Sequence, residues 1–404
     1  VASGRAWAAA DDLDQALARA VEGHHADPAA PGPTLLALDL MPQRPAAEAL
    51  VRDQLQGAQV EPALRMAYAR ALMGMQRYVD ATAQLERVTA DRPDLAPAHL
   101  SLGALHLEMR HPRQAEASLK RYLELAAAAR TGQAATEDEA DAESDGRADQ
   151  GRVQAWMMLA QAAELRGDFA AAESWLARID DPARALEVQT RLATLMARQG
   201  RVAEAREAVR RAPEREAGDA RAKLVAEASV LREVKRWADA YEVLGTAARR
   251  FTDDADLLYE QAMVAEKLDR MDDMERLLRR VIELKPDNAH AHNALGYSLA
   301  DRRQRLPEAR QLVQRALELA PGDPFITDSL GWIEYRLGNA AEAARLLRQA
   351  YSSRPDVEIG AHLGEVLWSM GQSDEARRVW GESRGRDAAN DVLRETLARL
   401  KVDL

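Results

Sequence analysis

Apolar residues recur along most of the chain at intervals of three and four residues, which is the spacing of one face of an α-helix. In the stretch 340–353, Ala343, Leu347 and Ala350 fall on one face, while Glu and Arg residues occupy the others. Proline follows many such stretches, because it cannot continue a helix; examples are Pro93, Pro286, Pro321 and Pro355. The pattern predicts an all-helical protein.

The helical pattern itself repeats with a period close to that of a helix pair. Residues 289–323 align with 324–356, and Gly296 and Gly331 fall 35 residues apart. One small or flexible apolar residue marks the middle of each second helix: Ala81, Ala115, Ala172, Ala205, Ala240, Met274, Ala309, Ala343 and Ala376. Neighbouring markers are 33 to 35 residues apart, except for one step of 57. Such a period indicates a repeat architecture.

Each period has the same internal order of residues. The first helix carries Leu followed by Gly or a similar pair, as in Leu330-Gly331 and Leu159-Ala160, where a small residue lets a neighbouring helix come close. A turn follows, usually with glycine and a polar residue as in Gly338-Asn339, because glycine adopts the left-handed conformation that ends a helix. The second helix then carries the marker alanine. Each period is therefore predicted to be a helix-turn-helix unit.

This pattern resembles the tetratricopeptide repeat, a helix-turn-helix unit of about 34 residues that stacks on its neighbours. The resemblance implies an all-α solenoid, a right-handed superhelix of about ten repeats. Nine repeats are expected within 62–130 and 153–390, at 62–95, 96–130, 153–185, 186–220, 221–254, 255–288, 289–323, 324–356 and 357–390. A degenerate repeat is expected at 28–61, a partial repeat without its first helix at 1–27, and a capping helix at 391–404.

The step of 57 residues implies an insertion at 131–152. Seven acidic residues and one arginine lie between Glu137 and Asp149, so this tract carries a charge of −6 out of a formal −11 for the whole chain. A segment with so few apolar residues cannot offset its ordering entropy, and we expect a disordered loop. It is either a solvated spacer or an acidic segment that attracts a basic partner.

Composition restricts the chemistry. The chain has 404 residues and no cysteine, which excludes disulfides, thiolate metal sites and a cysteine nucleophile. Its net negative charge disfavours nucleic-acid binding, which depends on Lys and Arg. No run approaches the roughly 18 apolar residues of a membrane-spanning helix.

Candidate catalytic chemistry is sparse. Motifs for phosphate-binding loops, zinc proteases and nucleophile elbows do not occur in the sequence. Neither of the two close histidine pairs, His99 with His106 and His290 with His292, has a carboxylate at metal-ligand spacing. We therefore expect a protein that is not an enzyme and that binds no metal and no cofactor.

The resemblance to tetratricopeptide repeats implies that the first helices line a concave surface that binds protein or peptide partners. The family's inward-facing positions correspond in this chain to Arg198, Arg232, Tyr259, Met263, Lys267, Asn293, Tyr297, Asp301, Phe325, Asp328, Trp332, Tyr335, Arg336, Glu365 and Trp368. The aromatic members are expected to anchor a bound segment, with charged groups fixing its orientation. In the alternative interpretation, Trp332 and Trp368 fill gaps between adjacent repeats. The family's Lys/Asn carboxylate clamp is missing here.

The C-terminal run is more specific. NALGYSLADR, EARQLVQRALELAPGDPFITDSLGWIEYRLG and HLGEVLWSMGQSDEARRVW are similar to bacterial outer-membrane lipoproteins of the tetratricopeptide class that serve as adaptors for a periplasmic carboxyl-terminal processing protease. That resemblance implies a periplasmic scaffold that binds the protease and presents substrates such as cell-wall hydrolases. It also implies a lipidated cysteine before Val1 in the precursor, and contact with the membrane only through that lipid.

Two other classes of protein are compatible with the same repeats. One is a cytosolic assembly factor or regulatory scaffold, whose precursor would start with methionine and carry no signal. The other is a regulatory segment of a larger enzyme, which the partial N-terminal repeat permits and the capping helix disfavours.

Overall fold

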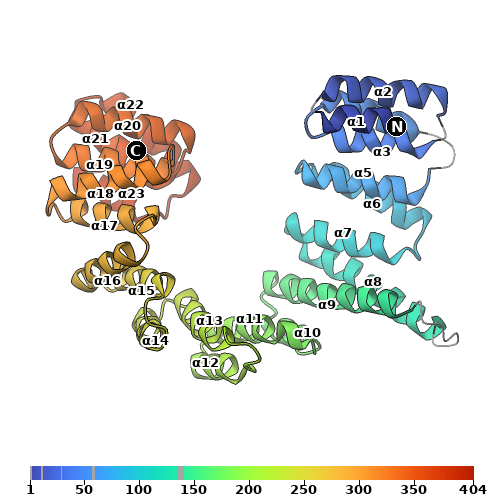
Figure 1. Cartoon of the computed structure of the whole chain (residues 1–404), viewed down its shortest axis with the longest axis horizontal. Helices are drawn as coiled ribbons and strands as arrows, with labels where there is room; N and C mark the ends of the chain where they lie inside the picture. Colours follow the sequence, from blue (N-terminus) through green and yellow to red (C-terminus); the bar gives the residue numbers. More distant parts are fainter. Residues whose placement is uncertain (1, 11, 29, 57–59, 134–140) are drawn as a thin grey trace. The chain divides into compact units, whose positions relative to one another are not determined.

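Figure 1 shows a computed structural model of the chain, which describes residues 2–10, 12–28, 30–56, 60–133 and 141–404. Every regular element among these residues is helical, so the prediction of an all-α fold is confirmed. The chain divides into two compact parts, which we call the N-terminal half (Val1–Leu195) and the C-terminal half (Met196–Leu404). Each half is built from helix pairs and is described by itself.

The helices of the N-terminal half follow the repeat pattern from α5 onward. They are α1 (Ala2–Ala9), α2 (Leu13–Ala26), α3 (Pro31–Leu40), the 3-10 helix η1 (Pro45–Ala47), α4 (Glu48–Gln54), α5 (Pro62–Gly74), α6 (Tyr78–Asp91), α7 (Ala96–Glu108), α8 (Pro112–Gln133), α9 (Asp141–Leu165), α10 (Phe169–Leu176), the 3-10 helix η2 (Pro182–Arg184) and α11 (Ala185–Arg198). Helix α11 starts in the N-terminal half and ends just inside the C-terminal half.

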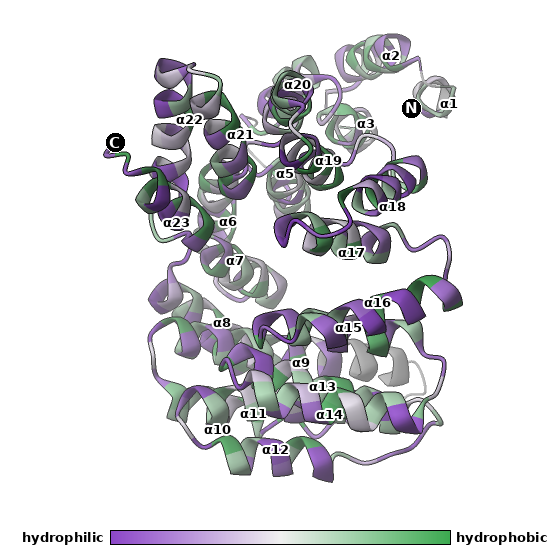
Figure 2. Ribbon diagram, turned by 90° about the vertical axis from the view of Figure 1, so that its left-hand side faces the viewer, coloured by the Kyte–Doolittle hydropathy of each residue, from purple (hydrophilic) through white to green (hydrophobic). Residues whose placement is uncertain are grey.

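The C-terminal half continues with the same alternation of first and second helices. They are α12 (Val202–Arg211), α13 (Asp219–Glu233), α14 (Trp237–Arg250), α15 (Ala255–Lys267), α16 (Met271–Leu284), α17 (Ala289–Asp301), α18 (Leu306–Leu319), α19 (Pro324–Arg336), α20 (Ala340–Ser353), α21 (Val357–Ser369), α22 (Ser373–Arg386) and α23 (Asp391–Leu400). Figure 2 shows apolar and polar residues on the same helices; α16, for example, buries Met274, Leu278 and Val281 on one face.

The two helices of a repeat pack closely because small residues line their contact. The eight marker alanines have no exposed surface, and Met274 in the same slot is 3% exposed. A Cβ atom at Gly331 on α19 would lie 2.7 Å from Cγ of Leu347 on α20. Any larger residue at position 331 would therefore push the second helix away from the first.

A left-handed residue ends the first helix in nine repeats. The positions are Gln76, Arg110, Gly167, Gly200, Lys235, Asp269, Arg303, Gly338 and Gly371, all with φ between 54° and 91°. The next backbone N–H then donates back to a carbonyl of the first helix, as from Asn339 to Glu334 at 2.8 Å. This is the Schellman arrangement, and it reverses the chain within three residues.

The capping helix α23 packs on α21 and α22. Leu393 of α23 and Val402 beyond it are buried in the core of the last repeat, with Leu397 and Leu400 packed against them. The stripe of leucines thus covers an apolar face that would otherwise be exposed.

The structure differs from the sequence predictions at two places. Helix α8 extends to Gln133 and α9 begins at Asp141, so most of the predicted loop 131–152 is helical, while residues 134–140 lie outside the described part. Alanine, glutamate and arginine favour helix, and α9 extends as one helix into the packed repeat that follows. At the other place, α1 supplies a short first helix before α2, where the sequence indicated that this helix was missing.

We expect Gly338→Ala to lower the free energy of unfolding by about 1 kcal/mol, because a Cβ disfavours the left-handed conformation. Arg110→Ala is the matched control: Arg110 has φ 57° and already carries a Cβ, so its truncation should be nearly neutral. Denaturant unfolding of both variants measures the difference. Equal effects of the two substitutions would contradict this account of the turn.

Candidate partner-binding site

The residues expected to bind partners lie on the first helices of successive repeats in the C-terminal half (Figure 1). These helices are α11, α13, α15, α17, α19 and α21. Helix α17 packs on α19, and α19 packs on α21. The contacts place side chains from three consecutive repeats next to one another. We call the resulting group, Tyr297, Asp328, Trp332, Arg336 and His362, the inter-repeat cluster.

A chain of hydrogen bonds runs through the inter-repeat cluster. Nδ1 of His362 on α21 lies 3.0 Å from both carboxylate oxygens of Asp328 on α19. Its Nε2 lies 3.4 Å from the hydroxyl oxygen of Tyr297 on α17. The imidazole and the carboxylate are both buried, at 4% and 7% exposure. One imidazole therefore bridges three repeats.

The carboxylate sets the charge of this imidazole. Burial is the largest single influence on the pKa of His362 and lowers it. The charge and hydrogen bond of Asp328, together with the charges of Glu358 and Glu365, raise the pKa by more, so that the net shift is upward. A protonated imidazole donates from Nδ1 to Asp328 and from Nε2 to the hydroxyl oxygen of Tyr297. Burial also raises the pKa of Tyr297, which keeps its hydroxyl protonated. The buried imidazolium of His362 is thus paired with the buried carboxylate of Asp328, and a buried charge is stable only with such a partner.

Trp332 lies inside this cluster. Its ring stacks on that of His362, with centroids 4.3 Å apart and an angle of 23°. The guanidinium carbon of Arg336 lies 4.3 Å from the indole centroid, and Arg336 also forms an ion pair with Asp301 at 3.6 Å. The indole is only 3% exposed. Trp332 therefore fills the space between repeats, as the alternative interpretation of the sequence held.

Trp368 and Glu365 face the end of the helix array. Glu365 is 3% exposed and its carboxylate accepts from Arg399 of the capping helix at 2.5 Å. The ring of Trp368 lies 5.8 Å from that of Trp380, and Arg377 lies 5.5 Å from its centroid. Both first-helix residues thus contribute to packing at the last repeat.

Of the fifteen residues expected to bind partners, the structure buries Asp328, Trp332 and Glu365. The reason is that each contacts a helix of a neighbouring repeat or the capping helix, which the sequence position alone does not reveal. The other residues remain at least partly exposed: Arg198, Arg232, Tyr259, Met263, Lys267, Asn293, Tyr297, Asp301, Phe325, Tyr335, Arg336 and Trp368.

These exposed residues do not form one group. Arg198 pairs with Glu233 at 2.6 Å and Arg232 pairs with Glu260, so both cations bind the helix of the next repeat. Phe325 is 43% exposed, with Arg354 lying 5.1 Å from its ring centroid. Among the candidates, Phe325 on α19 is the one large apolar residue classed as exposed.

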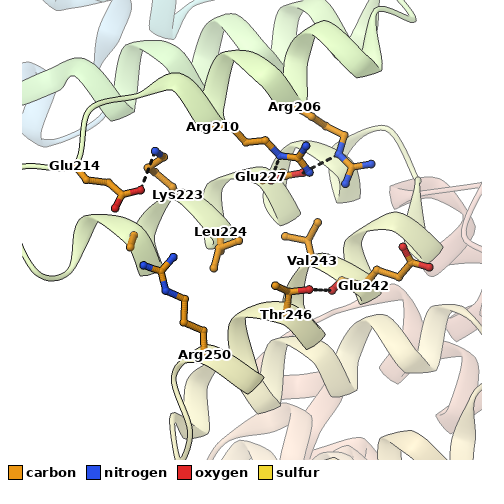
Figure 3. A pocket seen from close by; sticks show the side chains of 11 residues that line it. Arg206, Arg210, Glu214, Lys223, Leu224, Glu227, Glu242, Val243, Thr246 and Arg250 are labelled. Carbon is orange, nitrogen blue, oxygen red and sulfur yellow. Dashed lines mark hydrogen bonds and ion pairs between the residues drawn. The ribbon is translucent and has the colours of Figure 1, made fainter.

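His362 is the main residue that sequence reasoning missed. His362 lies on α21, whereas its partners Asp328 and Tyr297 lie on α19 and α17. It also occupies none of the family's inward-facing positions, so only the packing of these first helices reveals it. The sequence also gave no sign of a pocket of about 340 Å³ between α12, α13 and α14 (Figure 3). There Arg206 and Arg210 converge on the carboxylate of Glu227, which is 2% exposed, with N–O distances of 2.7 Å.

A larger hollow of about 500 Å³ lies in the N-terminal half between α9 and α11. Its lining combines methionine, glutamine and charged side chains, among them Met157, Gln161 and Arg191. Arg191 is held by Glu164 at 2.9 Å. Flexible methionines beside amide groups can adapt to varied segments of a partner.

Two further kinds of feature in the described part of the chain would bear on function, a metal-binding cluster and a membrane-spanning helix. Within this part, no three His, Asp or Glu side chains come together in a way that could hold a metal ion. Among the same residues, no helix is both long and apolar enough to span a membrane.

Comparison with known proteins agrees with this architecture. Family models of the tetratricopeptide repeat match residues 255–288, 274–324 and 329–390, so this part of the chain carries tetratricopeptide repeats. Repeats of this kind generally bind other proteins, and these models describe no enzyme. The particular kinship to protease adaptors is not part of these matches.

Among individual proteins, the TPR repeat-containing protein PA4667 of Pseudomonas aeruginosa is 35% identical to the chain over 242 residues. The match covers 60% of the chain and 41% of that protein, so the chain spans less than half of its relative. A tetratricopeptide repeat protein of Parabacteroides merdae superposes with a TM-score of 0.46 and 15% identity, over 61% of this chain and 98% of that one. A thermophilic tetratricopeptide repeat protein of Thermus thermophilus superposes with a TM-score of 0.40 and 20% sequence identity, over 45% of this chain and 100% of that one.

We expect Trp332→Ala to lower the free energy of unfolding by about 3 kcal/mol, because it leaves a cavity between His362 and Arg336. Phe325→Ala is the control: it removes an aromatic ring of the same helix that is 43% exposed, and should cost less than about 1 kcal/mol. Denaturant unfolding measures both. A Trp332→Ala variant as stable as the control would show that the indole does not hold the repeats together.

The cluster also predicts a pH dependence of stability. Because the pKa of His362 is raised in the folded protein, its stabilisation is fully present below the ordinary value of 6.5 and is lost as pH rises through the raised value. Unfolding free energies of the wild type and of His362→Gln are measured from about pH 6 to about pH 9. The wild type should have the larger unfolding free energy at low pH, and its difference from His362→Gln should shrink as pH rises. A difference that stays constant or grows with pH would contradict this.

Proposed function

We propose that the chain is a non-catalytic scaffold that binds peptides or partner proteins along the first helices of its C-terminal half. The observation that supports this most directly is the mixture of accessible side chains on α15, α17 and α19. Tyr259 and Tyr335 are half-buried, whereas Lys267, Asp301 and Phe325 are exposed. All five occupy positions that face the binding surface in tetratricopeptide repeats.

This surface can both anchor and orient a bound segment. The ring of Phe325 offers apolar area that a partner can bury, and aromatic side chains often dominate the energy of such interfaces. Lys267 and Asp301 carry opposite charges on the first helices of adjacent repeats, which favours one direction of an extended or helical segment. The buried inter-repeat cluster holds α17, α19 and α21 in a fixed arrangement, so little ordering entropy is lost on binding.

We further propose that the partner is a periplasmic carboxyl-terminal processing protease, to which the scaffold delivers substrates such as cell-wall hydrolases. The support is the similarity of the C-terminal run, from Asn293 to Trp380, to adaptors of that kind. The proposal includes a periplasmic location and a lipid on the precursor that anchors it at the outer membrane.

The test is binding of the purified chain to a carboxyl-terminal processing protease, and cleavage of a cell-wall hydrolase with and without the chain. The double variant Phe325→Ala/Tyr335→Ala should bind at least about tenfold more weakly, because two accessible anchors are lost. Trp332→Ala, assayed at a temperature where it is folded, should keep its affinity, since the indole is 3% exposed.

Val79→Ala is the matched surface control, because Val79 is 77% exposed on the second helix α6. It should leave both affinity and stability unchanged. If the protease does not bind the wild type, or if cleavage is the same without the chain, the adaptor role is wrong. If a partner binds but the double variant binds equally well, the first-helix surface around α19 is not the site.

A further inference from the structure

A cavity of about 260 Å³ lies in the N-terminal half between α4, α5 and α6. Its lining is strongly basic: Arg52, Arg65, Arg77 and Arg87 contribute four guanidinium groups, and Asp80 contributes one carboxylate. The cavity is formed by the second helices of two adjacent repeats and by the first helix between them. It is therefore separate from the first-helix surface proposed above to bind partners.

Two of these arginines are neutralised within the protein. Glu48 receives an ion pair from Arg52 at 2.7 Å and another from Arg77 at 2.6 Å, and it also accepts from the hydroxyl of Tyr68. These contacts lower the pKa of Glu48 to about 2, with the hydrogen bond from Arg77 as the largest cause. Arg77 also pairs with Asp80 at 2.5 Å. Arg52 and Arg77 thus need no further anion.

Arg65 is different, because it is buried without a carboxylate. It is 7% exposed, and its two terminal nitrogens donate to neutral oxygens, the side chain of Gln84 at 3.2 Å and the carbonyl of Leu55 at 3.3 Å. No described carboxylate lies within ion-pair distance of it. Burying an uncompensated charge is costly.

Arg87 increases this cost. It is exposed at the same cavity and forms no ion pair among the described residues. Burial, and next the charge of Arg87, lower the pKa of Arg65, while the charge of Asp91 acts in the opposite direction. Two positive charges thus border one cavity, and neither forms an ion pair with a described carboxylate.

The C-terminal half provides an internal comparison. The pocket in Figure 3 has the same construction, with second helices α12 and α14 and the first helix α13 between them. There the protein supplies its own anion, since buried Glu227 receives Arg206 and Arg210. Glu227 is the seventh residue of its repeat. The seventh residue of the repeat at the N-terminal cavity is Tyr68, whose hydroxyl donates a hydrogen bond to Glu48. The N-terminal cavity lacks the carboxylate that neutralises its counterpart.

We propose that the cavity between α4, α5 and α6 binds an oxyanion, a carboxylate or phosphate group, held by the guanidinium groups of Arg65 and Arg87. Guanidinium groups bind such anions through paired, charge-assisted hydrogen bonds. The amide of Gln84, which already accepts from Arg65, orients that side chain. The bound anion would supply the negative charge that the carboxylate of Glu227 supplies in the C-terminal half.

The same chemistry has two sources, a small free anion or an acidic side chain of a peptide. Inorganic phosphate and a tetraglutamate peptide with blocked ends are the probes for the two. Calorimetric titration of the full chain is done at constant ionic strength, with sodium chloride as the reference salt. Binding of phosphate identifies the first source, and binding of the peptide alone identifies the second; either supports the proposal.

Arg87→Gln should weaken binding of the effective probe by about tenfold or more, because one charge-assisted contact is lost. Without an anion and at low salt, the same variant should be at least as stable as the wild type, since it removes a like charge from beside Arg65. Arg65→Gln should abolish binding. If the buried substitution Arg65→Gln prevents folding, the exposed substitution Arg87→Gln still tests the proposal. Arg113→Gln, at an exposed arginine of α8 that forms no ion pair among the described residues, is the matched control and should bind normally.

Two results would overturn the proposal. In the first, neither phosphate nor tetraglutamate binds the wild type more tightly than chloride does. In the second, Arg87→Gln and Arg113→Gln weaken binding equally, which indicates a diffuse effect of net charge.

Discussion

The structure depends on the close approach of two helices within each repeat. Alanine at eight of the nine marker positions leaves only a methyl group between the helices, and glycine at position 331 leaves no side chain. A left-handed residue, two positions before the second helix in most repeats, sets the angle at which the chain returns. Everything else in the fold, including the grooves between second helices and the surface of the first helices, follows from repeating this one contact.

The buried carboxylates are neutralised by side chains from outside their own repeat. Buried carboxylates at Glu227, Glu334 and Glu365 each receive an arginine from another helix: Arg206 and Arg210 for the first, Arg310 for the second and Arg399 for the third. Because each pair joins two helices, it fixes the register in which they pack as well as neutralising the buried charge. Arg65 is the opposite case, a buried cation whose counter-charge does not come from the neighbouring repeat.

The sequence allows the helix pairs to be predicted because their signal is local. Spacing, alanine markers and turn residues all act within one repeat, so one chain suffices to place most helices. Burial of Trp332 and the partnership of His362 with Asp328 depend on how one first helix lies against the next, and no sequence spacing encodes this. The helical start of α9 at Asp141 was missed for another reason: low hydrophobicity indicated disorder, while high helix propensity next to a packed helix favours extension.

The contact between Tyr297 and His362 joins repeats that are not neighbours in the chain, since the repeat of Asp328 lies between them. In a linear array with contacts only between adjacent units, each boundary can separate independently, and the array opens gradually from its ends. A bond that skips one repeat removes that independence, because the middle repeat cannot open without disturbing the contact between the outer two. The three repeats of α17 to α22 thus form a single cooperative block, which is a stiffer segment than three separate helix pairs.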